Sequence, residues 1–141
     1  AKRNNLSDTV KFRVANVLDE LPRLAADGEK YDVVILDPPA FTKSREATKN
    51  AIKGYREINM KGLKLVKDGG FLATCSCSHF MTQELLAKTV KEAAKATHKR
   101  LRQVEFRTQD RIIRYCGPTQ LMYRSRIILS FSFSRSLMRS R

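Results

Sequence analysis

Apolar residues alternate or cluster in several stretches of this 141-residue chain, and these stretches predict strands. Val10, Phe12 and Val14 alternate with polar residues, which is the pattern of a half-buried strand. The run YDVVILD at residues 31–37 has four consecutive Val, Ile or Leu residues, as in a parallel-sheet strand that is buried on both faces. FLATCSC at 71–77 and RLRQVEFR at 100–107 predict two further strands. The alternation in RIILSFSF at 126–133 is compatible with a final strand, but whether residues 110–141 fold is left open by the sequence.

Helical spacing fills the segments between these strands. VLDELPRLAADGEK at 17–30 predicts a short helix that Gly28 closes. A second helix is expected from about residue 44 to 67, with KDGG ending it, and a third from an N-cap at Thr82 to about His98. Strands that alternate with helices are typical of an α/β fold, here a Rossmann-like, doubly wound, mostly parallel sheet.

Charge is the strongest signal in the composition. The chain has 28 Lys and Arg against 14 Asp and Glu, a formal net charge of +14 at pH 7. A surface this basic attracts polyanions, usually nucleic acid, although a basic enzyme that charge merely keeps soluble is the alternative. Three cysteines do not form a disulfide framework, and no apolar run is long enough for a membrane span. We therefore expect a cytoplasmic protein with no membrane association, of open oligomeric state.

Two unusual tripeptides stand at the ends of predicted strands. Asp37-Pro38-Pro39 follows the strand at 31–36, and Cys75-Ser76-Cys77 ends the strand at 71–77. Ligands of open α/β sheets bind outside the carboxyl ends of the strands. We therefore expect the two tripeptides to lie side by side.

The Asp-Pro-Pro turn has the properties of a nucleobase contact. Consecutive prolines fix the backbone and remove two donors, so the Asp37 carboxylate points in a set direction beside bare carbonyl oxygens. Such acceptors suit the amine or ring N–H of a base. Phe41 is placed to stack on a base, and Lys43 and Arg45 to contact phosphate. A plain turn with a solvated Asp is the alternative.

The cysteines allow several interpretations. Cys75 and Cys77 point to one face of their strand and are too close along it for a comfortable disulfide. His79 completes a Cys-x-Cys-x-His run, but only Cys116 and His98 remain as further zinc ligands, in distant context, so we predict no metal site. Buried packing and a reactive thiol remain. A strand end that faces a basic cleft supplies the electropositive surroundings of a reactive thiol.

A thiolate and a carboxylate opposite a nucleobase indicate methylation at cytosine C5. Addition of the thiolate to C6 makes C5 nucleophilic toward an electrophilic methyl group, while an acid near N3 balances the charge. A base then removes the C5 proton and the thiolate leaves. In this hypothesis Cys75 or Cys77 is the nucleophile and Asp37 is the acid.

Residues 31–80 combine Asp-Pro-Pro with Lys43-Ser44-Arg45, GYREIN and TCSCS. In this combination they closely resemble the catalytic half of class I S-adenosylmethionine-dependent methyltransferases. The nearest group is the large-subunit ribosomal RNA cytosine-C5 methyltransferases. The resemblance covers roughly residues 1–109, and it implies S-adenosyl-L-methionine as cofactor and RNA, in particular ribosomal RNA, as partner.

The resemblance also implies roles for single residues. Asn16 and the adjoining Val17 would contact the adenine side of the cofactor, and Asp37 and Pro38 would border it. Asp37, Pro38 and Pro39 would line the target-base pocket. Cys75, in its Thr-Cys-Ser context, matches the attacking cysteine, while Cys77 assists release or simply packs.

The chain departs from this family in two places. The glycine-rich cofactor loop and the ribose-binding acid of the family would precede residue 1. We therefore interpret residues 1–109 as the carboxyl-terminal part of an incomplete catalytic domain, which we expect to bind cofactor poorly and not to turn over alone. Residues 110–141 form an atypical basic tail with 7 Arg, no Lys and 1 acid. With suitable codons, a one-base shift over residues 111–118 gives Asp-His-Pro-Ile-Leu-Trp-Ala, which is close to the family segment, so we hypothesise a frameshift.

Two rival functions remain from the sequence. An exocyclic-amine methyltransferase would use the Asp-Pro-Pro turn without a cysteine nucleophile. A non-catalytic RNA-binding module of the same fold would use only the basic surface. Replacement of Cys75 by Ala separates the first rival from cytosine-C5 methylation.

Overall fold

The computed structural model describes residues 1–41, 46–78, 80–108 and 127–133, with the backbone alone for residue 108 and residues 127–133. The elements are a 3-10 turn (Lys2–Asn4), helices α1 (Val17–Ala26), α2 (Thr48–Leu65) and α3 (Gln83–Ala96), and strands β1 (Tyr31–Leu36), β2 (Val66–Ser76), β3 (Leu101–Thr108) and β4 (Ile127–Phe133). The three predicted helices are confirmed, each within a few residues of its expected bounds.

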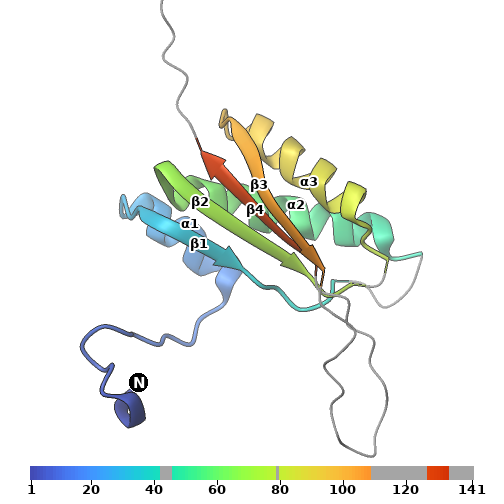
Figure 1. Ribbon diagram of the computed structural model, residues 1–141. Coiled ribbons are helices and arrows are strands. Elements are labelled where there is room, and N and C mark those ends of the chain that lie inside the picture. Colours follow the sequence, from blue (N-terminus) through green and yellow to red (C-terminus); the bar gives the residue numbers. More distant parts are fainter. Residues whose placement is uncertain (42–45, 79, 109–126, 134–141) are drawn as a thin grey trace, which may run out of the picture.

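The strands form one sheet in the order β1-β2-β4-β3 (Figure 1). β1 and β2 are parallel, and β4 runs antiparallel to both of its neighbours, β2 and β3. β1, β2 and β3 therefore share one direction. The α/β class and the mostly parallel sheet are confirmed. The segment 126–133, whose folding the sequence left open, contains β4, which lies inside the sheet.

All three described helices lie on one face of the sheet (Figure 1). α2 is the centre of this layer, because it contacts β1 and β2 as well as α1 and α3. Its buried residues recur every three or four positions, which is the spacing of one helix face. Gly62 allows the helix to approach the sheet closely, since a Cβ there would lie 2.8 Å from a methyl group of Leu36. The core therefore lies between α2 and the β1–β2 pair.

The bounds of α1 follow from local chemistry. The Asn16 side chain caps the helix by accepting a hydrogen bond from the Leu18 N–H, at 3.1 Å. Pro22 lies inside the helix and has no N–H to offer to the carbonyl four residues earlier. That carbonyl belongs to Leu18, and the Lys61 ammonium of α2 donates to it at 2.9 Å. A lysine of the neighbouring helix thus replaces the missing backbone hydrogen bond.

Two predictions about strands are wrong. Residues 10–16 form no strand, and Phe12 and Val14 are exposed. The outer edge of β1 is not occupied by any described strand, and this segment does not pair with it. β1 is also buried on one face only, because Val33 and Ile35 are 54% and 69% exposed. The second layer of helices of a doubly wound sheet is not among the described residues.

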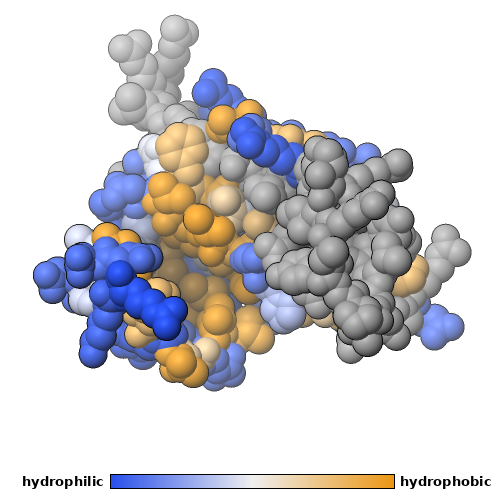
Figure 2. Space-filling model, turned by 60° about the horizontal axis from the view of Figure 1, so that its bottom comes forward, coloured by the Kyte–Doolittle hydropathy of each residue, from blue (hydrophilic) through white to orange (hydrophobic). Residues whose placement is uncertain are grey.

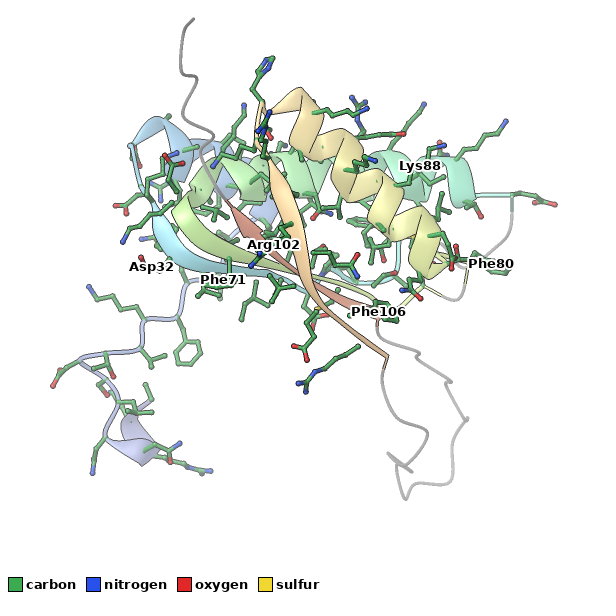
Figure 3. All side chains as sticks on the ribbon, turned by 45° about the horizontal axis from the view of Figure 1, so that its top comes forward. Asp32, Phe71, Phe80, Lys88, Arg102 and Phe106 are labelled. Atoms are coloured by element: carbon green, nitrogen blue, oxygen red, sulfur yellow. The ribbon has the colours of Figure 1, made fainter. Side chains whose placement is uncertain are left out.

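This open face carries further apolar side chains. Phe71 of β2 pairs with Val33, and Ala73 pairs with Ile35. Phe71 lies on the side of the sheet away from the helices (Figure 3). Figure 2 shows an apolar region on the face of the molecule that it presents. Among the described residues, no helix is long and apolar enough to cross a membrane.

The sequence analysis predicted that KDGG ends the second helix and precedes the strand. Instead, KDGG lies inside β2, where the pairing of β2 with β1 is irregular. The register changes between Tyr31, which pairs with Val66, and Val33, which pairs with Phe71. Gly69 supplies a left-handed backbone conformation (φ 81°) at this bulge. Gly70 lies against β1, where a Cβ would be 2.7 Å from the Asp32 carbonyl oxygen. In this bulge Gly69 thus allows a positive φ, and Gly70 allows the close approach of β1.

We expect Gly70→Ala to lower the free energy of unfolding by about 2 to 3 kcal/mol, because the added methyl group forces the β1 and β2 backbones apart. Gly69→Ala is the matched control, since its Cβ would meet nothing within 4 Å and only its positive φ opposes substitution. That change should cost about 1 kcal/mol. Urea unfolding at equilibrium measures both changes. A larger loss for Gly69→Ala than for Gly70→Ala would contradict this account of the bulge.

Candidate active site at the carboxyl ends of the strands

The parallel pairing of β1 with β2 brings the two predicted tripeptides together. Leu36, the last residue of β1, pairs with Thr74, so the chain that follows each residue leaves the sheet at the same edge. The Cys77 thiol lies 3.9 Å from the Pro38 carbonyl oxygen, to which it donates a long sulfur hydrogen bond. The expected proximity of Asp-Pro-Pro and Cys-Ser-Cys is therefore confirmed for Pro38 and Cys77.

The two cysteines differ in exposure. Cys75 is 6% exposed, whereas Cys77 is half-buried and its thiol faces Pro38. Among the described residues, no group of three His, Cys, Asp or Glu side chains is placed to hold a metal ion. His79 and Cys116, which the sequence analysis weighed as ligands, lie outside the described residues.

A buried tyrosine anchors the cysteine-bearing turn. Tyr55 of α2 is fully buried, and its hydroxyl accepts a hydrogen bond from the Ser76 hydroxyl at 2.9 Å. The Ser78 N–H in turn donates to the Ser76 oxygen at 3.2 Å. Ser76, which precedes Cys77, is thus bonded to the buried Tyr55 hydroxyl, and Ser78, which follows Cys77, is bonded to Ser76.

The same tyrosine contacts the chain beyond the prolines. The rings of Phe41 and Tyr55 meet edge to face, with centroids 4.7 Å apart and planes at 86°. Phe41 also lies over Gly54, where a Cβ would be 3.4 Å from the ring. Phe41 was proposed to stack on a base, and here it packs in part against α2. Its role toward a base stays a prediction.

Burial raises the pKa of the Tyr55 hydroxyl. The hydrogen bond from Ser76 acts in the opposite direction, and so does a hydrogen bond with the Phe41 backbone. Negative charge on Cys77 or Asp37 raises the pKa further, which places this hydroxyl within electrostatic reach of both tripeptides. The tyrosine therefore stays protonated at neutral pH.

The residues expected on the cofactor side lie at the start of α1. Asn16 uses its oxygen to cap the helix and donates from its nitrogen to Asp19 at 2.7 Å. Val17, the first helical residue, is half exposed. An amide oxygen with a second lone pair, beside an exposed apolar side chain, suits a purine ring. This acceptor oxygen and the exposed apolar side chain fit the adenine side of the cofactor, while the roles of Asn16, Val17, Asp37 and Pro38 stay predictions.

Lys43 and Arg45, the predicted phosphate contacts, lie outside the described residues. Sequence reasoning missed Tyr55 and Ser76 as parts of the site. Tyr55 lies on the buried face of α2, within the helix that the sequence predicts from about residue 44 to 67. The available signal was the hydroxyl group, because a buried tyrosine needs a hydrogen-bond partner and the sequence does not say which.

Solved structures with this arrangement of elements define the fold. A methyltransferase crystallised with S-adenosylhomocysteine matches 94% of this chain and 37% of its own length, with a TM-score of 0.65 and 15% sequence identity. The chain therefore has the fold of the S-adenosylmethionine-dependent methyltransferases, as the sequence analysis predicted. At this low identity the likeness concerns the fold alone.

The curated proteins that resemble the chain in sequence include two ribosomal RNA methyltransferases. A ribosomal RNA large subunit methyltransferase of Methanocaldococcus jannaschii is 38% identical over 107 residues, which are 75% of this chain and 27% of that protein. Ribosomal RNA large subunit methyltransferase I of Shewanella frigidimarina is 39% identical over 92 residues, 64% of this chain and 23% of that protein. The chain thus spans about a quarter of the length of these relatives. No protein-family profile matches the chain.

The raised pKa of Tyr55 predicts a pH dependence of stability. The folded chain holds the phenolic proton more tightly than the unfolded chain does, so this contribution is complete below the ordinary tyrosine pKa of about 10. It is lost as the pH rises through the higher pKa of the folded state. We expect the stability difference between wild type and Tyr55→Phe to change above about pH 10, in the direction of a relatively weaker wild type.

Urea unfolding at several pH values from neutral to about 11 measures this difference. Tyr31→Phe is the matched control, because Tyr31 is partly exposed on β1. Lysine deprotonation affects all three proteins alike and cancels in the comparison. A stability difference that stays constant across this range would refute the account.

Proposed function

We propose that this chain is the carboxyl-terminal part of the catalytic domain of an S-adenosylmethionine-dependent methyltransferase that acts on ribosomal RNA and forms 5-methylcytosine. The observation that supports this proposal best is the contact between the two strand ends, where the Cys77 thiol lies 3.9 Å from the Pro38 carbonyl. A thiol group, a carboxylate residue and carbonyl acceptors thereby lie at one edge of the sheet. Cytosine-C5 methylation needs such a set.

The relatives support the substrate class. Both curated relatives described above are named ribosomal RNA large subunit methyltransferases. The net charge of +14 agrees with an RNA substrate. Pro39, Phe41, Lys43 and Arg45 are the residues we assign to the RNA. We place the enzyme in the cytoplasm.

The cofactor would lie between the start of α1 and the Asp-Pro-Pro turn. Asn16 and Val17 would hold its adenine, and Asp37 and Pro38 would border the reacting end. S-adenosylmethionine supplies an electrophilic methyl group when bound. Its binding is supported by the S-adenosylhomocysteine complex of a protein with the same fold.

The side chains of this chain would then act on the cytosine ring. The Cys75 thiolate forms a bond to C6, and the electron pair of the C5–C6 double bond becomes available at C5. Asp37, as the acid near N3, donates a hydrogen bond or proton that offsets the charge on the ring. After methylation, Asp37 takes back any proton that it gave to N3. Loss of the C5 proton to a base then allows the C6–S bond to break, and the thiolate returns. Cys77, beside Pro38, is the candidate for assisting this release.

We expect a covalent adduct on Cys75 when the full-length gene product is incubated with S-adenosylmethionine and RNA that contains 5-fluorocytidine. Fluorine replaces the C5 proton that must leave, so the enzyme stays bound to the ring through sulfur. Denaturing gel electrophoresis detects the adduct, and peptide mass spectrometry locates it.

Cys75→Ala and Cys77→Ala are the matched variants for this experiment. An adduct that persists in Cys75→Ala and maps to Cys77 would exchange the roles of the two thiols. Methyl transfer to ordinary RNA without any adduct would refute the C5 mechanism and favour methylation of an exocyclic amine. RNA binding without methyl transfer would leave a non-catalytic RNA-binding module.

A further inference from the structure

We propose that Tyr55 is a positioning residue that holds the Asp-Pro-Pro turn and the Cys-Ser-Cys turn at a fixed separation. The residue is fully buried, so it acts through its neighbours and not by contact with a substrate. The inference rests on the proposed function for its effect on catalysis. The contacts of Tyr55 on which the inference rests are present in the chain without cofactor or RNA.

The cysteine-bearing turn depends on the tyrosine hydroxyl. Ser76 donates to that hydroxyl at 2.9 Å, and the Ser78 N–H donates to Ser76 at 3.2 Å. Cys77 lies between these two buried serines and has its thiol directed at Pro38. Loss of the tyrosine hydroxyl leaves the Ser76 hydroxyl without its acceptor and releases one of the constraints on Cys77.

The proline turn depends on the tyrosine ring. Pro38 and Pro39 have no N–H groups, so the turn cannot be held by backbone hydrogen bonds donated from these positions. At one end it follows Leu36, which is buried in the core. Beyond the prolines, Phe41 lies edge to face with Tyr55 at 4.7 Å. One side chain of α2 therefore contacts the segments that carry both tripeptides.

The composition of this interface does not favour stability. Between α2 and β2 lies a polar strip of four fully buried residues, which we define as Tyr55, Asn59, Thr74 and Ser76. Within the part of the chain that the structure describes, the Asn59 Oδ1 and Thr74 Oγ1 atoms have no hydrogen-bond partner. Buried polar atoms without partners cost free energy, and apolar residues would pack here at lower cost. A departure of this kind is expected where a site needs a set geometry.

The reactivity of Cys77 tests the proposal without cofactor or RNA. The 141-residue chain is treated with iodoacetamide at several pH values, and peptide mass spectrometry follows each cysteine separately. We expect Tyr55→Phe to change the Cys77 rate by about three- to tenfold, the factor that corresponds to one hydrogen bond. Ser76→Ala should change the rate at least as much, because it also removes the acceptor of the Ser78 N–H. The effect of the double variant should fall short of the sum of the two single effects, because both single changes remove the hydrogen bond between Ser76 and Tyr55.

Tyr31→Phe is the control for the loss of a phenol hydroxyl. Unfolding in urea shows that each variant is folded, and Ser76→Ala replaces Tyr55→Phe if the latter does not fold. An unchanged Cys77 rate in folded Tyr55→Phe and Ser76→Ala would overturn the proposal and leave Tyr55 as core packing.

Methyl transfer by the full-length gene product supplies the second measurement. We expect Tyr55→Phe to lower kcat by about tenfold or more with KM nearly unchanged, since displaced groups react more slowly while binding persists. A raised KM with unchanged kcat would contradict positioning. If the wild type transfers no methyl group, the proposed function fails, and the iodoacetamide rates still decide the role of Tyr55.

Discussion

β1 and β2 run parallel with Leu36 opposite Thr74, and this register fixes where each of the two strand ends leaves the sheet. A shift by one residue would turn Val34 and Leu36 away from α2, which is the face on which the core depends. The register is therefore held by the burial of these side chains and by the bulge at Gly69 and Gly70. The register alone brings Pro38 and Cys77 together, because the long hydrogen bond between them is weak.

α2 adds the second constraint, because it connects the core to the site. Gly62 brings the helix close to β1 near its end, and Tyr55 lies two turns earlier along the helix, below the turns that follow the strands. The helix thus packs on the sheet at Gly62, and at Tyr55 it contacts the turns that follow β1 and β2. The site is built largely from residues in turns, while a rigid element sets their positions.

The sequence predicted the helices, the direction of the sheet and the meeting of the two tripeptides, because each depends on local spacing or on the general rule for strand ends. It failed where the answer depends on which neighbours are present. Val10, Phe12 and Val14 alternate as strand residues do, but they pair with no described strand, although the outer edge of β1 is open. The run in β1 is apolar on both faces, and only the face toward α2 is covered. The pairing of Tyr55 with Ser76 joins residues 21 positions apart and has no local signature.

Three lysines of this chain donate hydrogen bonds to backbone carbonyl groups. Lys61 donates to the Leu18 carbonyl that Pro22 leaves free, Lys99 donates to the Val66 carbonyl at 2.8 Å, and Lys30 donates to the Lys64 carbonyl. These three cations complete the backbone hydrogen bonding of helix and strand ends, so their charge is not simply surface charge available to a polyanion. A charge-neutralisation scan for RNA contacts would therefore score them as binding residues when their loss acts through folding. The proposed RNA contact is better tested at described cations that have no such backbone partner.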